Sequence, residues 1–176
     1  VSGQSRFGTS GSSSNALTFY TSSGLAGRIV ISGTSTSYNT SSDYRLKENI
    51  SDITDGITRV KQLQPKRFNF IHDADTTVDG FLAHEAQTVV PEAIHGTHNE
   101  TEAIGDITDA DSNTVETGVV EPDTLEDGHT WTETGTQPVY QGIDQSKLVP
   151  LLTAALQEAI TKIEDLETRV AALEAE

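Results

Sequence analysis

The sequence lacks cysteine, which excludes disulfide frameworks and metal sites built on thiolates. It also lacks an apolar run long enough to span a bilayer. Only 34% of its 176 residues are hydrophobic, which is little for a single well-packed globule. We therefore expect an elongated or oligomeric protein that buries apolar surface between subunits. The first residues fall in the middle of a pattern, so we expect the C-terminal part of a longer protein.

Charge is distributed unevenly along the chain. Residues 1–41 contain no acid and only two bases, Arg6 and Arg28, whereas residues 42–176 hold all 27 acids and nine bases. No lysine or arginine occurs between Phe68 and Ser146. An acidic surface of this kind repels nucleic acid and anionic membranes, so we expect neither as a partner.

Residues 1–41 are rich in Ser, Thr and Gly but contain two short β-like runs, at 16–20 and 27–31. The 21–26 segment between them contains Gly24, which favours a hairpin. An isolated hairpin is only marginally stable in water, so it needs upstream strands or identical chains beside it. We therefore expect a β-rich segment that packs against such partners, the alternative being a flexible linker.

The next part of the chain predicts a small mixed α/β body. Helical spacing predicts a helix through Ile50, Ile53, Ile57 and Val60, capped by Asp52 or Asp55 and ended by Pro65. Alternation predicts a strand over 66–71. A second short helix is predicted over 80–87, before Pro91.

Residues 96–138 show no periodicity and carry eleven acids. A structureless loop of this length is unusual within a compact domain. Two interpretations remain open: an extended acidic arm that grips another surface, or a disordered insert. Trp131 and the pair Val119-Val120 favour an arm with ordered contacts.

The C-terminal segment 146–176 predicts a helix capped by Ser146, with Pro150 in its first turn, where its missing N–H costs little. Apolar residues recur with heptad spacing along it. They are Val149, Leu152, Leu156, Ala159, Ile163, Leu166, Val170 and Leu173. Parallel strands would pair Lys162 with Glu167, and Arg169 with Glu174. We therefore predict a parallel coiled coil of identical chains, the alternative being a helix packed within its own chain.

Ser42 and Lys47 stand five residues apart where the two compositions meet, in the run Ser42-Asp43-Tyr44-Arg45-Leu46-Lys47. A serine hydroxyl attacks an acyl carbon when a base removes its proton, and lysine is that base in Ser-Lys variants of the catalytic triad. Free lysine has a pKa of about 10.4, and burial in an apolar pocket lowers it. The acidity of the chain opposes that change, so we expect only a packed, dry junction to activate Lys47.

The same run resembles the self-cleaving junction of the intramolecular chaperones that end many phage tail spikes and tail fibres, peptidase family S74. Three further blocks follow in the order that the family shows. They are Leu63-Gln64-Pro65 followed by Phe68, Gly80-Phe81-Leu82-Ala83-His84-Glu85, and Leu151-Leu152-Thr153-Ala154-Ala155-Leu156-Gln157-Glu158. His84 replaces the usual Gln, and residues 96–138 show no match.

The resemblance implies that Ser42 attacks the carbonyl of Ser41 and that Lys47 assists the cut, with Asp43, Arg45 and Leu46 as supporting motif residues. It implies an α+β, elongated homotrimer with a β-stalk end at 1–41 and a chaperone at 42–176. The chaperone would fold the upstream fibre and then leave it by single-turnover self-cleavage. The mature fibre would belong to the virion tail, and the released chaperone to the host cytoplasm.

We expect no cofactor and no metal, since the five histidines show no metal-ligand spacing. They are His72, His84, His95, His98 and His129. Two other functional classes stay open. One is a permanent, non-cleaving trimeric fibre tip that contacts a receptor, and the other is a fragment of a coiled-coil adhesin.

Overall fold

A computed structural model of the chain describes residues 13–175. The chain divides into two compact units, Val1–Asp52 and Ile53–Glu176. The predicted domain boundary between residues 41 and 42 therefore lies inside the first unit, eleven residues before this division. Within the described residues, no helix combines the length and the apolar character needed to cross a membrane.

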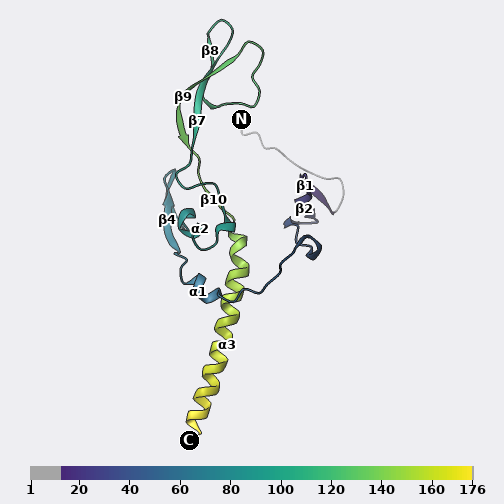
Figure 1. The fold of residues 1–176 in the computed structure, drawn as a ribbon, viewed down its shortest axis with the longest axis vertical. Helices are drawn as coiled ribbons and strands as arrows, with labels where there is room; N and C mark the ends of the chain where they lie inside the picture. The colour runs from purple at the N-terminus through teal and green to yellow at the C-terminus, as the bar shows by residue number, and fades with distance from the viewer. Residues whose placement is uncertain (1–12, 176) are drawn as a thin grey trace. The chain divides into compact units, whose positions relative to one another are not determined.

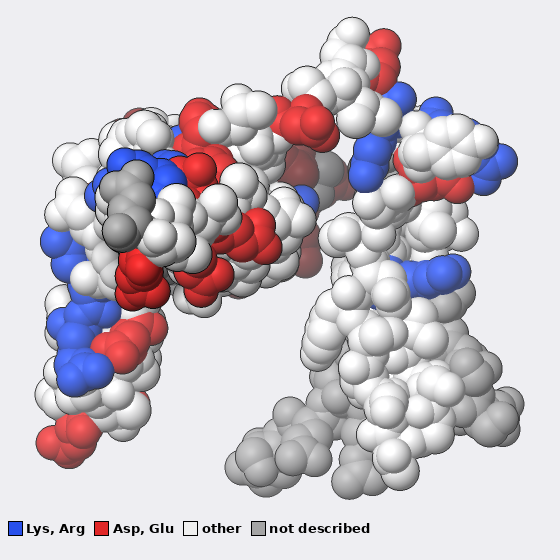
Figure 2. Space-filling model, turned by 90° about the horizontal axis from the view of Figure 1, so that it is seen from below, with Lys and Arg blue, Asp and Glu red and all other residues white. Residues whose placement is uncertain are grey.

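The first unit is a three-stranded antiparallel sheet in the order β1 (Ser13–Thr21), β2 (Gly24–Ser32) and β3 (Ser35–Thr40). The predicted hairpin is confirmed, but its connection is tighter than the 21–26 loop, because Thr21 pairs directly with Gly24. Gly24 has a φ of 114°, which favours glycine at this turn. The sequence analysis missed β3, because its Ser and Thr side chains are all exposed and show no apolar alternation. The strands of this three-stranded sheet contain no Asp or Glu, and their surface carries no red side chains in Figure 2.

The second unit mixes short helices with small sheets and ends in one long helix (Figure 1). The β4–β5, β6–β10 and β8–β7–β9 pairings are all antiparallel. The elements after Asp52 are α1 (Gly56–Val60), β4 (Lys66–Phe70), β5 (Asp73–Gly80), α2 (Ala83–Gln87), η2 (Pro91–Ala93), β6 (Ile94–His95), β7 (Thr101–Thr108), β8 (Thr114–Val120), β9 (Thr130–Pro138), β10 (Gly142–Ile143), η3 (Gln145–Lys147) and α3 (Leu148–Glu174).

The core of this unit forms where the first turns of α3 meet the segment around η2. Its buried side chains are Val89, Val90, Ala93, Leu148 and Leu151. Partly buried apolar residues of α1, of β6 and β10, and of the segments that follow α1 and precede α2 pack against them, so the base of α3 organises the unit. The rest of α3 projects from this core, and α1 lies beside it (Figure 1).

Two predicted helices and one predicted cap need correction. The helix predicted through 50–60 is only the five-residue α1, and Ile50 and Ile53 lie outside it with exposed side chains. Asp55 occupies the N-cap position of α1 but makes no capping hydrogen bond, so the predicted cap is wrong. The strand predicted over 66–71 is confirmed as β4, although its partner β5 was missed. The helix predicted over 80–87 begins at Ala83, because Gly80 ends β5.

Residues 96–138 are not a disordered insert. Their central part is the three-stranded sheet β8–β7–β9. Its outer strands β8 and β9 are mostly exposed, which explains why their sequences show no clear alternation. Trp131 lies against Gly105 and donates from Nε1 to the carbonyl oxygen of Val119 at 3.0 Å. A Cβ at Gly105 would collide with Trp131 and with the Thr132 carbonyl, so glycine permits this packing.

The C-terminal helix begins at Leu148, two residues after the predicted start. The predicted Ser146 cap is wrong. The Asp144 carboxylate accepts from the Ser146 backbone N–H at 3.0 Å and from its hydroxyl at 2.6 Å, so Asp144 caps η3. The prediction that Pro150 lies in the first turn is confirmed. Leu148, Leu151 and Ala155 are buried within the chain.

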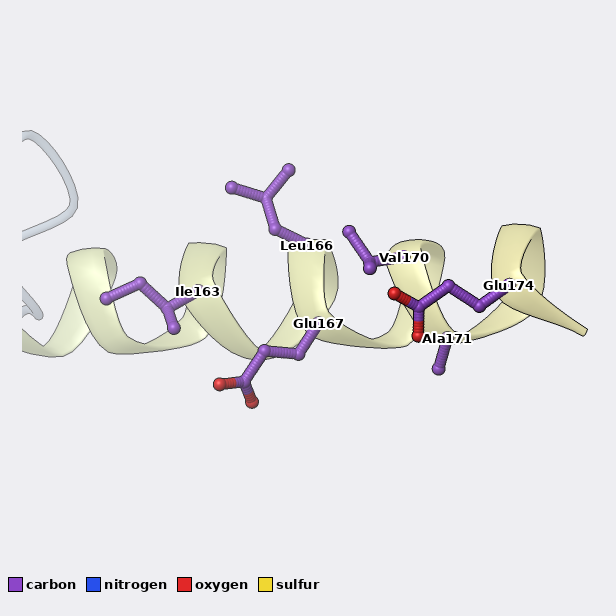
Figure 3. A pocket seen from close by; sticks show the side chains of 6 residues that line it. All are labelled: Ile163, Leu166, Glu167, Val170, Ala171 and Glu174. Atoms are coloured by element: carbon purple, nitrogen blue, oxygen red, sulfur yellow. The ribbon is translucent and has the colours of Figure 1, made fainter.

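The heptad residues occupy a different side of α3 and stay outside the core. Except for Ala159, they are 48% to 71% exposed in the single chain. Ile163, Leu166 and Val170 border a shallow apolar hollow flanked by Glu167 and Glu174 (Figure 3). The helix therefore packs within its own chain at its base and leaves the heptad stripe free along its length.

Candidate functional site

The first feature of the junction is the attachment of Ser41 to the end of the sheet. The backbone N–H of Ser41 donates to the carbonyl oxygen of Ala26 at 3.2 Å. Its hydroxyl donates to the carbonyl oxygen of Leu25 at 2.7 Å. Two hydrogen bonds to β2 therefore hold the residue whose carbonyl is the proposed target.

The chain then turns back through the 3-10 helix η1 (Tyr44–Leu46), capped by Asp43. The Asp43 carboxylate accepts from the Arg45 backbone N–H at 2.9 Å and from the Arg45 guanidinium at 2.9 and 2.8 Å. The guanidinium, followed by the backbone N–H, holds the pKa of Asp43 below its usual value. Asp43 and Arg45, predicted only as supporting motif residues, therefore close this turn.

The turn brings Lys47 back to Ser42, with Lys47 Nζ 2.8 Å from Ser42 Oγ. In this arrangement the amine donates and the hydroxyl accepts. Base catalysis needs the opposite direction, with a neutral amine accepting the hydroxyl proton. Both side chains are exposed in the single chain, so water reaches the pair.

Several aromatic and aliphatic side chains close to the junction in sequence are uncovered in the single chain. Tyr38, Tyr44, Leu46 and Ile50 are between 69% and 80% exposed. A hollow of about 250 Å³ lies beside the Ser41–Ser42 bond and is lined by residues of the paired strands β2 and β3. Its lining residues are Leu25, Gly27, Arg28, Asn39, Thr40, Ser41 and Ser42. Additional surface from outside this single unit is needed to exclude water from the pair.

Comparison with known protein families matches residues 42–95 to the peptidase family described as chaperone of endosialidase. Residues 42–95 are therefore similar to this chaperone family. The match begins at Ser42 and includes the junction and the next two sequence blocks, which confirms the resemblance inferred from those residues. Curated proteins gave no match to the chain.

The sequence blocks that resemble the chaperone family meet in one core. Leu63 and Phe81, one from each of two blocks, pack against the buried cluster that contains Leu151. Leu151 belongs to the third block, which lies beyond the matched residues. The blocks therefore supply the packing that joins the family domain to the base of α3.

His84, the departure from the usual Gln of the family, lies on α2 with its ring exposed. Its ring stacks on that of His98, with centroids 4.4 Å apart and planes at 7°. The stack connects the family domain to the segment that leads into β7. No spacing rule in the sequence indicated this pair, because the two residues belong to separate elements.

Two further contacts were missing from the sequence analysis. Glu158 caps α1 from more than one hundred residues away, and Trp131 packs on Gly105 across two strands. Glu158 was visible only as the last residue of a sequence block. Partners this distant in sequence leave no local spacing signal.

Proposed function

We propose that the chain is the C-terminal, self-cleaving intramolecular chaperone of a trimeric phage tail spike or tail fibre. The observation that carries the proposal is the 2.8 Å contact between Ser42 Oγ and Lys47 Nζ at the first residue of the chaperone-family match. The proposed cut lies between Ser41 and Ser42. It would separate the β-rich end of the fibre from the chaperone.

The proposed reaction begins when neutral Lys47 takes the proton from Ser42 Oγ. The oxygen attacks the Ser41 carbonyl carbon and forms a tetrahedral intermediate. Lys47 then returns the proton to the Ser42 backbone nitrogen as the carbon–nitrogen bond breaks. The product is an ester between the Ser41 carbonyl and Ser42 Oγ, together with a free Ser42 amine. Water hydrolyses the ester, leaving a Ser41 carboxylate and restoring the Ser42 hydroxyl.

The proposed trigger is assembly of identical chains. Burial favours the neutral form of a lysine, and the pair is exposed in the single chain. The exposed heptad stripe on α3 supplies the self-association surface, and the exposed aromatic and aliphatic residues around η1 supply surface to cover the junction. Cleavage would then occur only after the chains have associated in register.

The acidic β8–β7–β9 sheet is proposed to grip the upstream stalk of the same or a neighbouring chain. Residues 96–138 carry eleven acids and no base, whereas residues 1–41 carry two bases and no acid, so their charges are complementary. The test is deletion of residues 96–138 from the full-length fibre protein, followed by limited proteolysis of the stalk. Wild-type protease resistance after deletion would contradict this role.

The proposed function is tested by Ser42→Ala and Lys47→Ala in the assembled protein, with Ser51→Ala and Lys61→Ala as exposed controls. Denaturing electrophoresis should show cleavage of the wild type and both controls, whereas the two dyad variants stay full length. Ester formation needs the Ser42 oxygen, and proton removal needs the Lys47 amine. Absence of cleavage in every sample would favour a permanent structural tip that contacts a receptor.

A further inference from the structure

The helix α1, which follows the junction by eight residues, is capped by α3 rather than by its own flank. The Gly56 N–H donates to Glu158 Oε1 at 2.5 Å, and the Ile57 N–H donates to Glu158 Oε2 at 3.3 Å. Both carboxylate oxygens therefore satisfy N–H groups that the first turn of a helix leaves unpaired. Asp55 occupies the N-cap position but makes no such bond.

Gly56 allows this close approach. It is buried, and a Cβ added to it would lie 2.5 Å from the backbone nitrogen of Ala155 and 2.8 Å from the carbonyl carbon of Ala154. Backbone atoms cannot move aside as a flexible side chain would, so any larger residue separates α1 from α3. We call the Gly56–Glu158 contact the clasp.

The other end of α1 is fixed as well. The Arg59 guanidinium donates to the Val89 carbonyl oxygen at 2.7 Å and lies 3.8 Å from the Glu92 carboxylate. Val89 belongs to the buried core. A helix of five residues is too short to be stable alone, so the contacts at its two ends hold α1 in place.

We infer that Glu158 is a positioning residue for the self-cleavage reaction. It acts by holding the first turn of α1, to which residues 48–55 connect the dyad. The inference rests on the proposed function. Glu158 lies between the stripe residues Leu156 and Ala159, so association through the stripe also determines the rotation of the clasp about each α3. Residues 48–55 then tether Lys47 to the clasp, with a reach of about 30 Å when fully extended. Because this tether is short, it keeps the junctions of the associated chains near one another and so raises their effective concentration.

The test compares cleavage rate with assembled mass in the full chain. Glu158→Ala removes both acceptors but leaves the heptad stripe intact, so we expect wild-type mass and cleavage slowed about tenfold or more. Glu158→Gln retains one acceptor oxygen and should fall between Ala and wild type. Glu164→Ala, exposed on the same helix, is the matched control and should cleave like wild type.

A second variant tests the inference even if Glu158→Ala fails to fold. Inserting four Gly and Ser residues between Asn49 and Ile50 lengthens the tether without altering the clasp or the dyad, and it should also slow cleavage. Wild-type cleavage in assembled Glu158→Ala overturns the inference alone. If Glu158→Ala does not assemble, wild-type cleavage in both Glu158→Gln and the tether variant overturns it. If the wild type is never cleaved, the proposed function falls and the inference falls with it.

Discussion

Lys47 Nζ lies 2.8 Å from Ser42 Oγ because a capped 3-10 turn folds the five-residue interval back on itself. The pair lies directly after Ser41, which two hydrogen bonds fasten to β2. One side of the proposed cut is therefore held by a sheet, and the other side carries the nucleophile and its base.

Hydroxylamine should divert the reaction at its ester stage. If Ser42 Oγ carries the Ser41 acyl group, the added amine competes with water, and the N-terminal fragment should end in a hydroxamate instead of a carboxylate. Peptide mass spectrometry of that fragment detects the change. A carboxylate alone, at a cleavage rate that hydroxylamine does not alter, would argue for direct attack by water.

Opening the η1 turn should slow cleavage without removing either member of the dyad. Asp43→Ala loses the cap and the Arg45 pair, whereas Asp43→Asn keeps an oxygen acceptor for the Arg45 N–H. We expect slow cleavage in the first variant, partial recovery in the second and wild-type rates in the Asp52→Ala control. Time courses on gels measure all three, and equal rates would mean that the turn forms without its cap.

Acidification should open the same turn. The pKa of Asp43 is lowered in the folded chain, chiefly by the Arg45 side chain. The stabilisation is therefore complete above the ordinary Asp pKa of 3.8 and is lost as pH falls through the lower folded value. The NMR shift of the Arg45 amide should follow this loss, with a midpoint below 3.8. A midpoint at or above that value would mean that the Asp43–Arg45 pair does not persist in solution.

Much of the local structure was predictable, since hairpin chemistry, the heptad pattern and the junction motif are contained in neighbouring residues. The missed features depend on partners that are distant or uniformly exposed. The β3 strand has no buried face, and the acidic sheet has so little core that Ile107 is its main buried apolar residue. The sequence predicted Asp52 or Asp55 as the cap of α1, because local rules favour a nearby acid. The close packing of Gly56 on α3 instead places Glu158 at this end of the helix.

The acidic sheet should depend on Gly105. Gly105→Ala places a methyl group against Trp131 and the Thr132 backbone, so it should destabilise the sheet by about 1–3 kcal/mol. Gly135→Ala on β9 is the control, because nothing lies within 4 Å of the added carbon. Trp131 is the only tryptophan, so its fluorescence during urea unfolding reports on this sheet. Equal transitions for the two variants would contradict the packing of Trp131 on Gly105.

The heptad stripe should hold three chains together. Branched residues at one heptad position with Leu at the other favour a coiled coil of two chains. The resemblance to fibre proteins and the uncovered N-terminal sheet favour three chains. Light scattering of the Ser42→Ala chain, which is expected to stay uncleaved, should give about three times the 18.9 kDa chain mass. Leu166→Asp should dissociate the assembly, because it places a charge from each chain between the heptad stripes at a cost of several kcal/mol. Thr161→Asp, at an exposed position outside the stripe, should leave the assembly intact. A mass near twice that of the chain would rule out the trimer.

The most direct test of self-cleavage is the intact mass of the purified, assembled wild-type chain followed over time. The 18.9 kDa species should be replaced by two fragments whose masses place the cut between Ser41 and Ser42, and Ser42→Ala should remain whole under the same conditions. A wild-type chain that keeps its full mass after assembly, or a cut at any other bond, would contradict the account.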